Sequence, residues 1–368
     1  MSFREGADVI ETSGERKLKN RKTKKIFLHM KLEKSQTAGH KAVADCETIM
    51  RKMGYEQFDI VHNQSGNKIM KAVQIIVQFL KLLQVKEGTE IIVEHPLYIH
   101  YIYILCLKFV KKIKNIKLIF IVHDLEILRG LLKSKGAVKK DKIMFEIADI
   151  MIIHNEKMKK YLIEEQHIEE RRLAVLEIFD YLVSNENAVK YNKTEDALKR
   201  IVIAGNLSKE KSSYIYKLDK LFLSNIKIYL YGGNFEKKEN VRNCIYKGAY
   251  DADILPNVME GDYGLVWDGP ELSRCEGNTG NYMRYNNPHK VSLYIAAELP
   301  IIIWDQAALA DFVTKNHIGI TVDSLEKIEE ELSKITEEQY RVLKDNLRKL
   351  SVKVQNGYYL ENALQKVV

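Results

Sequence analysis

The most constraining feature of this chain is the segment from Tyr263 to Trp304, where two short apolar runs enclose a helical pattern. Residues 264–267 and 301–304 are uncharged and mostly branched or aromatic, which predicts two buried strands. Residues 290–297 predict a helix that ends near Pro300. A strand, a helix and a second strand in this order are typical of an α/β sheet.

The beginning of this helix is a candidate anion site. Pro288 is tolerated in a first helical turn, so His289 and Lys290 fall where backbone N–H groups and the helix dipole favour a negative charge. A lysine in that position is a candidate phosphate ligand. A solvated lysine on an ordinary helix is the alternative, and spacing alone does not decide between the two.

The size and composition of the chain indicate a soluble two-domain protein. Its 368 residues suffice for two domains of ordinary size, and 46% are hydrophobic and 29% charged. We find no uncharged apolar run near the ~18 residues of a membrane span, and no secretory signal. The four cysteines are not spaced as metal pairs or as CxxC, which fits a reducing cytoplasm.

Positive charge is concentrated in the first half. Residues 1–184 carry 33 Lys and Arg against 24 Asp and Glu, whereas residues 185–368 carry 25 against 26. Residues 16–25 alone contain seven basic side chains, so we expect residues 1–24 to form a basic disordered tail. A cationic first domain predicts an anionic surface as partner. A membrane surface is favoured over nucleic acid because no nucleic-acid-binding motif is present.

The first half repeats a strand-and-helix pattern. A strand at 26–29, a small-residue loop at 35–40 and a helix over about 41–53 resemble the beginning of a Rossmann-like unit. The loop contains Thr37 and Gly39 but not GxGxxG, so no dinucleotide site follows. It is a candidate substrate loop, with a plain connection as the alternative. Further strands are expected near residues 58–61, 90–96, 117–124, 147–155 and 173–179.

Two helices of the first half are strongly apolar. The helix over about 68–84 carries an apolar stripe on one face: Ile69, Val73, Ile76, Val77, Leu80 and Leu83. For the helix over 99–114 we favour a place in the buried core, with an interfacial membrane helix as the alternative.

A polar pair, His123 and Asp124, ends the strand at 117–124. Ligands of open α/β sheets gather at the carboxyl ends of strands, which makes the pair a site candidate. Asp124 could accept the proton of an acceptor hydroxyl, or it could cap the next helix.

The pattern restarts after residues 184–198, whose polar composition predicts a linker. A strand from 200 ends in a turn at Gly205 and Asn206, followed by Lys209, and a strand from 226 ends at Tyr231 and Gly232. Bare glycine backbone can approach a ligand closely.

The triplet 251–253 has the DxD form of a metal site. We assign it instead to a turn with Asp251 as a helix cap, and we expect no metal ligands.

These motifs resemble one bacterial group of GT-B glycosyltransferases. The resemblance is densest over residues 263–312, in Tyr-Gly-Leu-Val-Trp-Asp-Gly and in Asn-Asn-Pro-His-Lys with the helix after it. The group includes galactofuranosyltransferases of surface-polysaccharide clusters and glucosyltransferases that extend GlcNAc on adhesins. It implies an α/β GT-B fold with two Rossmann-like domains, at 25–183 and 199–350, and a segment 351–368 that packs back on the first domain.

The resemblance also implies a function and a set of site residues. It implies that Lys290 contacts the diphosphate of a UDP-sugar and acts in catalysis with Asp124. The remaining residues for which we expect substrate contacts are Thr37, Gly39, His123, Gly205, Asn206, Lys209, Tyr231, Gly232, Trp267, Asp268, Asn281, Tyr285, His289, Ser292 and Tyr294.

We therefore expect transfer of a sugar, galactofuranose first, from a UDP-sugar to a glycan acceptor, without cofactor or metal. The acceptor is expected to be linked to lipid or protein. The enzyme is expected in the cytoplasm, at the inner membrane face, and a homo-oligomer is left open. Alternatives are a glucosyltransferase acting on a glycoprotein, a UDP-sugar epimerase and a non-catalytic partner of another transferase.

Overall fold

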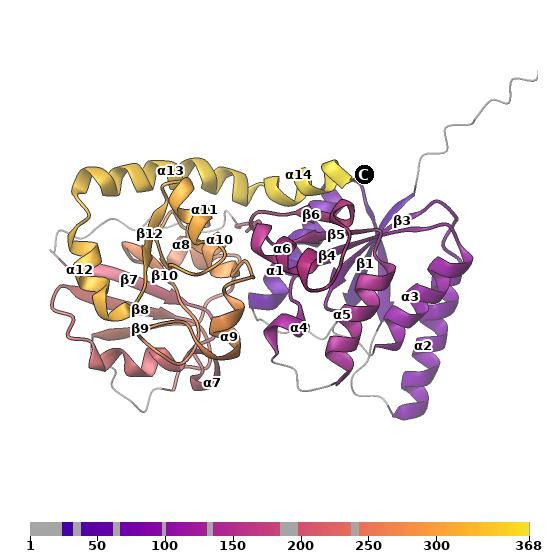
Figure 1. Ribbon diagram of the computed structural model, residues 1–368, viewed down its shortest axis with the longest axis horizontal. Helices are drawn as coiled ribbons and strands as arrows, with labels where there is room; N and C mark the ends of the chain where they lie inside the picture. The colour runs from indigo at the N-terminus through magenta and orange to yellow at the C-terminus, as the bar shows by residue number, and fades with distance from the viewer. Residues whose placement is uncertain are drawn as a thin grey trace, which may run out of the picture.

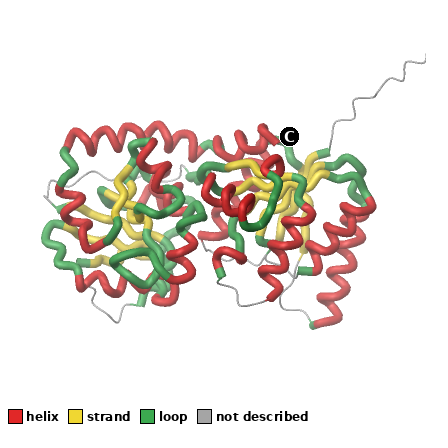
Figure 2. Tube along the Cα trace, in the orientation of Figure 1, coloured by secondary structure: helices red, strands yellow, loops and turns green. Residues whose placement is uncertain are grey.

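The computed structural model describes residues 24–31, 38–61, 67–97, 101–130, 135–184, 198–236 and 243–367. They form two α/β domains that lie side by side (Figure 1). In each domain a central sheet is flanked by helices (Figure 2). Residues 185–197 of the predicted linker, residues 1–23 of the predicted tail and Thr37 lie outside the described residues.

The first domain contains a parallel sheet of six strands in the order β2-β1-β3-β4-β5-β6. The strands are β1 (Lys25–Lys31), β2 (Glu56–Val61), β3 (Glu90–His95), β4 (Lys117–Val122), β5 (Ile150–Ile153) and β6 (Leu173–Val175). Its helices are α1 (Ala38–Lys52), α2 (Lys68–Leu83), α3 (Ile102–Ile113), α4 (Glu126–Arg129), α5 (Lys135–Ile147), α6 (Glu156–Glu164) and the short η1 (Glu170–Arg172). The central strands β3 and β4 are almost wholly buried. β4 is apolar after Lys117, whereas β3 also buries Glu90, Glu94 and His95.

The second domain repeats the design in the order β12-β11-β10-β7-β8-β9. Its strands are β7 (Lys199–Ala204), β8 (Ile226–Tyr231), β9 (Cys244–Gly248), β10 (Tyr263–Val266), β11 (Ile301–Trp304) and β12 (Gly319–Val322). The helices before the last two are α7 (Lys209–Ser212), η2 (Ser213–Lys220), α8 (Leu255–Val258), α9 (Gly277–Tyr282), α10 (His289–Ala296), α11 (Ala310–Lys315), η3 (Leu325–Lys327) and α12 (Ile328–Ser333).

Both sheets have a point at which the strand order reverses. β1 lies between β2 and β3, and β7 lies between β8 and β10. A crevice opens at the carboxyl ends of the strands at such a point, and ligands of open α/β sheets bind there. The topology therefore predicts candidate ligand sites at the carboxyl ends of β1, β3 and β4 and of β7, β8 and β10.

The last two helices, α13 (Glu337–Gln355) and α14 (Tyr358–Val367), cross from the second domain to the first (Figure 1). α13 packs on α10, and α14 packs on α1, β5 and β6. The carboxylate of Asp180 accepts hydrogen bonds from the backbone N–H groups of Tyr359 at 3.1 Å and Leu360 at 2.8 Å. The end of the chain is thus part of the first domain's packing.

Several elements differ from the sequence prediction. β9 and β12 were not predicted; they are edge strands, only partly buried, and lack a long apolar run. The short helix α9, in the polar segment before Pro288, was not predicted either. Asp251 does not cap α8, which follows Ile254; its carboxylate instead accepts a hydrogen bond from Asp253 N–H at 2.9 Å.

The helix α2 forms where predicted, but its apolar stripe faces outward. Ile69, Val73, Ile76, Val77 and Leu80 are exposed, while Leu82 is buried. The neighbouring helix α3 buries Tyr103, Ile104, Leu107 and Val110 in the core, as favoured from its sequence. Among the described residues, we find no helix with the length and hydropathy to cross a membrane.

Candidate functional site

The carboxyl edge of the second sheet is formed by two glycine turns. Gly205 and Gly232 follow β7 and β8 with φ of 124° and 142°, in the region that favours glycine. A Cβ atom on Gly232 would lie 1.8 Å from the carbonyl oxygen of Gly205. The two turns are also joined by a 2.9 Å hydrogen bond from Gly205 N–H to Tyr231 C=O. Only glycine lets these two turns approach so closely.

Lys290 lies beside the first of these turns. α10 begins at His289, so Lys290 is in its first turn, as predicted. Its Nζ is 3.3 Å from both the Trp267 carbonyl oxygen and Asp268 Oδ1, at the end of β10. A Cβ on Gly205 would lie 3.5 Å from Lys290 Cε. The ammonium group and a helix N-terminus therefore meet above bare backbone, which is a suitable environment for a diphosphate.

The remaining predicted residues of the β7 turn lie at its rim. Asn206 is exposed, and its side-chain oxygen accepts hydrogen bonds from Ser208 N–H and the Asn234 amide, both at 3.1 Å. Lys209 begins α7 and places its Nζ 3.5 Å from a Glu236 carboxylate oxygen. Both polar groups can be reached from solvent.

Four other predicted contact residues have buried side chains. Tyr294 places its hydroxyl between β7 and β10, where it accepts a hydrogen bond from Ala204 N–H at 3.0 Å. The other three are likewise buried and bonded to backbone: Tyr231 to Glu260 N–H, Trp267 to Glu271 C=O and Ser292 to Phe179 C=O. These side chains hold the strands and α10 in place and present no open surface, so direct substrate contact by them stays a prediction.

His289 and the polar loop before it face the first domain. The His289 ring stacks on Tyr181 at 4.9 Å, and burial lowers its pKa to about 4. Tyr285 packs edge-on against Tyr161 of α6 at 5.5 Å, and the two line an open groove of about 560 Å³ between the domains. Asn281, in α9, is exposed.

From the first domain, His123 and Asp124 reach the same interdomain region. The His123 ring stacks on Phe179 at 5.2 Å, and burial lowers its pKa to about 4, so it is neutral at pH 7. Asp124 does not cap α4; its carboxylate pairs with Arg129, while burial raises its pKa. The hydroxyl of Tyr282, from the second domain, accepts a hydrogen bond from Leu125 N–H at 3.1 Å, which brings the pair against α9.

The prediction missed a polar cluster beside His123. Glu94, at the end of β3, has an oxygen 3.5 Å from His123 Nε2, and neither atom has a hydrogen-bond partner among the described residues. The sulfur of Cys46 lies within 4.8 Å of both. Thiolate, carboxylate and imidazole are ligand types that zinc takes. Burial raises the pKa of both Cys46 and Glu94 well above the usual values, because it disfavours their charged forms.

A second missed group joins the domains directly behind the site. The Asn287 backbone N–H donates to His154 Nδ1 at 2.8 Å, and its side-chain amide donates to the carbonyl oxygens of His154 and Glu177. Asn155 donates to the Asn287 side-chain oxygen at 2.8 Å. Asn287 directly precedes Pro288 and α10, so these bonds fix the beginning of the Lys290 helix. The Asn-Asn-Pro-His-Lys motif contained this residue, but its partners are more than a hundred positions away.

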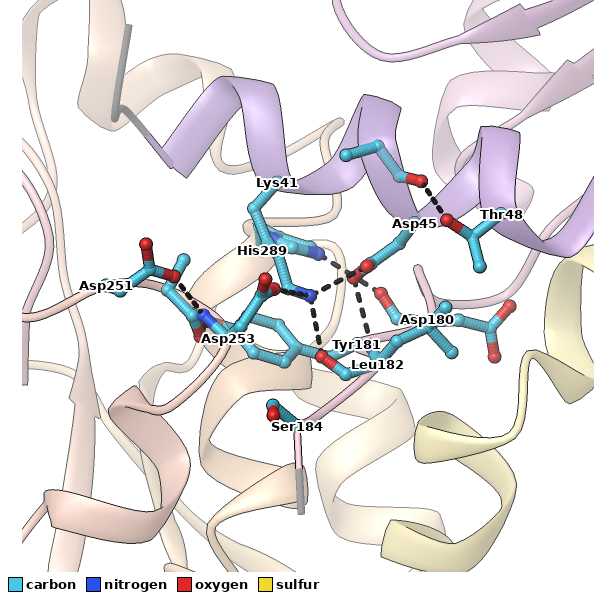
Figure 3. Close-up of polar contacts among 12 residues, drawn as sticks. Lys41, Asp45, Thr48, Asp180, Tyr181, Leu182, Ser184, Asp251, Asp253 and His289 are labelled. Carbon is cyan, nitrogen blue, oxygen red and sulfur yellow. Dashed lines mark hydrogen bonds and ion pairs between the residues drawn. The ribbon is translucent and has the colours of Figure 1, made fainter. Parts of the chain in front are cut away.

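A third group that the prediction missed surrounds Lys41 of α1 and also joins the two domains (Figure 3). Its Nζ donates to Asp45 Oδ1 at 2.7 Å, to Leu182 C=O at 2.6 Å and to Asp253 Oδ1 at 2.5 Å. One buried cation thus connects α1, the segment after β6 and a turn of the second domain. Gly39, of the predicted substrate loop, lies in the first turn of α1 near this junction.

Comparison with known proteins agrees with this architecture. The family model for the N-terminal domain of glucosyltransferase 3-like proteins matches residues 24–178, and the model for their C-terminal domain matches residues 201–367. The chain belongs to the glucosyltransferase 3-like family. It is a glycosyltransferase with the GT-B fold, as its motifs indicated.

Two curated relatives of this glucosyltransferase 3-like protein are informative. The β-1,6-galactofuranosyltransferase WbbI of Escherichia coli K12 is 32% identical over 337 residues, 90% of this chain and 94% of WbbI. Glucosyltransferase 3 of Streptococcus gordonii is 23% identical over 254 residues, 69% of this chain and 71% of that protein.

Two solved structures share the fold at low sequence identity. Sucrose-phosphate synthase of Thermosynechococcus elongatus is 14% identical with a TM-score of 0.58, covering 93% of this chain and 97% of that one. The pneumococcal O-GlcNAc transferase GtfA, in complex with UDP and GlcNAc, is 13% identical with a TM-score of 0.50, covering 79% of this chain and 59% of that one.

Proposed function

We propose that this glucosyltransferase 3-like enzyme transfers galactofuranose from UDP-galactofuranose to a glycan acceptor in surface-polysaccharide synthesis. The extensive match to a β-1,6-galactofuranosyltransferase supports this sugar. The more distant match to glucosyltransferase 3 supports glucose as the second choice. The observation that carries the proposal is the position of Lys290, in the first turn of α10 and beside Gly205.

In the proposed reaction the second domain binds the UDP-sugar and the first domain binds the acceptor. The bond between the anomeric carbon and the diphosphate breaks, and negative charge grows on the leaving UDP. The Lys290 ammonium and the N–H groups at the start of α10 stabilise that charge. No metal is needed for this step, because the cation and the helix N-terminus supply the positive potential.

The acceptor hydroxyl forms the new bond to the anomeric carbon and loses its proton. We assign the proton to Asp124, which lies at the carboxyl end of β4 at the interdomain surface. Burial raises the pKa of this carboxyl group. A carboxylate with a raised pKa is a stronger base, which suits it to this step.

The proposed acceptor is a glycan linked to lipid or protein, met in the cytoplasm at the inner membrane face. The support is the positive charge of residues 1–184, which attracts an anionic surface. A glycan on a lipid carrier would be presented at such a surface.

The test is a thermal-shift and donor-hydrolysis screen with UDP, UDP-galactofuranose, UDP-glucose, UDP-galactose, UDP-GlcNAc and GDP-mannose, in the presence of EDTA. We expect stabilisation by UDP and by one UDP-sugar. Lys290→Ala should lower turnover by about 10²- to 10³-fold, the usual effect of removing one group that stabilises a developing anion. Lys315→Ala, an exposed lysine of the same domain, is the matched control.

Two results would contradict the proposal. No response to any nucleotide would exclude the transferase assignment and favour a non-catalytic partner. Activity that EDTA abolishes and a divalent cation restores would contradict the metal-free step.

A further inference from the structure

The helix α2 is apolar on two opposite faces. Ile75, Phe79 and Leu82 pack toward the core of the first domain. The opposite side carries six exposed apolar side chains: Ile69 (74%), Met70 (51%), Val73 (53%), Ile76 (56%), Val77 (42%) and Leu80 (52%). A helix that is hydrophobic all round is normally buried. Among the described residues, nothing buries the outer side of α2, although its apolar sequence is typical of a buried helix face.

The neighbouring helix α3, which packs on α2, adds two further exposed apolar side chains. Its Phe109 and Ile113 are each 50% exposed, and the Phe109 ring packs edge-on against Phe79 of α2 at 5.6 Å. We call the eight exposed side chains on the two helices the α2–α3 apolar face. In the described part of the chain, eight of the fourteen large apolar side chains that are exposed belong to it. A concentration of this kind marks an interaction site, whereas single exposed apolar residues are ordinary.

The charges around this face select the type of partner. The sequences of α2 and α3 contain six lysines and no acidic residue. Within the described residues, Lys81 and Lys112 are exposed and form no ion pair with a carboxylate. Pairing with a second copy through the same face would bring these positive charges together, which is unfavourable. An anionic lipid surface offers the complementary charge and an apolar layer beneath it.

We infer that the α2–α3 apolar face inserts into the surface of an anionic phospholipid membrane. This inference names the part of the protein that would make the membrane contact in the proposed function. It rests on the proposed function only for the reason why the enzyme would bind a membrane. α2 has 16 residues and is about 24 Å long, so it can lie in the interfacial plane without spanning it. The two helices are at the outer end of the first domain, away from the second (Figure 1), so the cleft stays open while the face is bound.

Vesicle co-sedimentation of the full chain tests the inference. We expect binding to phosphatidylcholine vesicles that contain phosphatidylglycerol, weaker binding at high salt and little binding to phosphatidylcholine alone. The double variant Ile76→Ser with Leu80→Ser should weaken binding by about tenfold or more, because two apolar contacts are lost. Phe222→Ser with Val342→Ser removes two exposed apolar side chains of the second domain and should leave binding unchanged.

Two outcomes would overturn the inference. One is a wild-type protein that stays in the supernatant with both kinds of vesicle. The other is a wild-type dimer that the Ile76 and Leu80 double variant converts to a monomer, with vesicle binding unaltered; the face would then join two copies. Donor hydrolysis in the absence of vesicles, measured on the same variants, reports separately on the proposed transferase function.

Discussion

At the carboxyl edge of the second sheet, position 232 requires glycine. Its φ of 142° and the 1.8 Å separation between a hypothetical Cβ and the Gly205 carbonyl oxygen leave no space for a side chain. We expect Gly232→Ala to lower the free energy of unfolding by more than about 2 kcal/mol, since it combines a clash with an unfavourable backbone conformation.

The adjacent Gly233 gives a matched control, because a Cβ there has no heavy atom within 4 Å. Gly233→Ala should change the free energy of unfolding by less than about 1 kcal/mol. Urea denaturation of both variants measures the difference. Equal effects would show that the close approach of the two turns does not matter.

At His154 burial makes stability depend on pH. The side chain is 1% exposed, and burial, with His123 nearby, lowers its pKa to about 3. The ordinary pKa of histidine in an unfolded chain is about 6.5. The unfolded state therefore binds a proton that the folded state does not, so stability is present above pH 6.5 and is lost as the pH falls toward 3.

A comparison with His154→Asn isolates this effect, since asparagine can still accept the hydrogen bond from Asn287 N–H but does not titrate. The stability of wild type relative to this variant should fall by about 2 kcal/mol between pH 7 and pH 5. Denaturant unfolding at the two pH values measures it. Parallel pH profiles for the two proteins would contradict the prediction.

For single residues, the sequence predicted the place of a residue in the fold better than the direction of its side chain. Lys290 lies where its motif placed it, because a proline and a helix beginning are local features. Tyr294 and Trp267 were expected at the substrate, yet both are buried. Their neighbours in the motif do not determine which way a side chain points. Glu94 and Cys46 were missed because their proximity to His123 arises from three separate elements.

At the scale of elements, the buried strands were predictable and the edge strands were not. β4 and β11 are buried along almost their whole length and read as apolar runs. β9 and β12 pair with one neighbour each and are only partly buried, so their sequences carry little signal. The periodicity of α2 predicted a helix, but two apolar faces on one helix do not reveal which face packs.

The Lys41 junction connects α1 to elements far away in the sequence, with Asp253 212 positions distant. Lys41→Met would leave the carboxylate of Asp45, 4% exposed, without its cation. We expect the free energy of unfolding to fall by about 3 kcal/mol, the usual consequence of breaking a buried ion pair.

Asp253→Asn is the control for this prediction, because the Asp253 side chain is 58% exposed. It should cost less than about 1 kcal/mol, as exposed ion pairs do. Thermal or chemical unfolding of the two variants measures both. A larger loss for Asp253→Asn would mean that the second domain, and not Asp45, requires the cation.

At the scale of the whole molecule, α14 makes the first domain depend on the end of the chain. Leu360 and Leu364 are buried against this domain. Replacing both with alanine should cost about 2–5 kcal/mol per site. Because the loss falls on the contact with one domain, we expect the unfolding transition to broaden or to separate into two steps.

The control is the double variant Glu361→Ala with Gln365→Ala, on the exposed side of the same helix, where the two side chains bond each other at 3.0 Å. It should unfold like the wild type. Differential scanning calorimetry resolves the transitions. If both double variants unfold alike, the docking of α14 contributes nothing to holding the domains together.

The two passages of the chain between the domains also set how the domains can move. One passage follows β6, where Ser184 N–H donates to Asp253 C=O at 3.1 Å, and the other lies at Gly357, where a Cβ atom would come within 2.6 Å of Ile49 of α1. A body held at one point can tilt in any direction, whereas a body held at two points can only swing about the line through them. We therefore expect any opening of the domains to follow a single arc about that line.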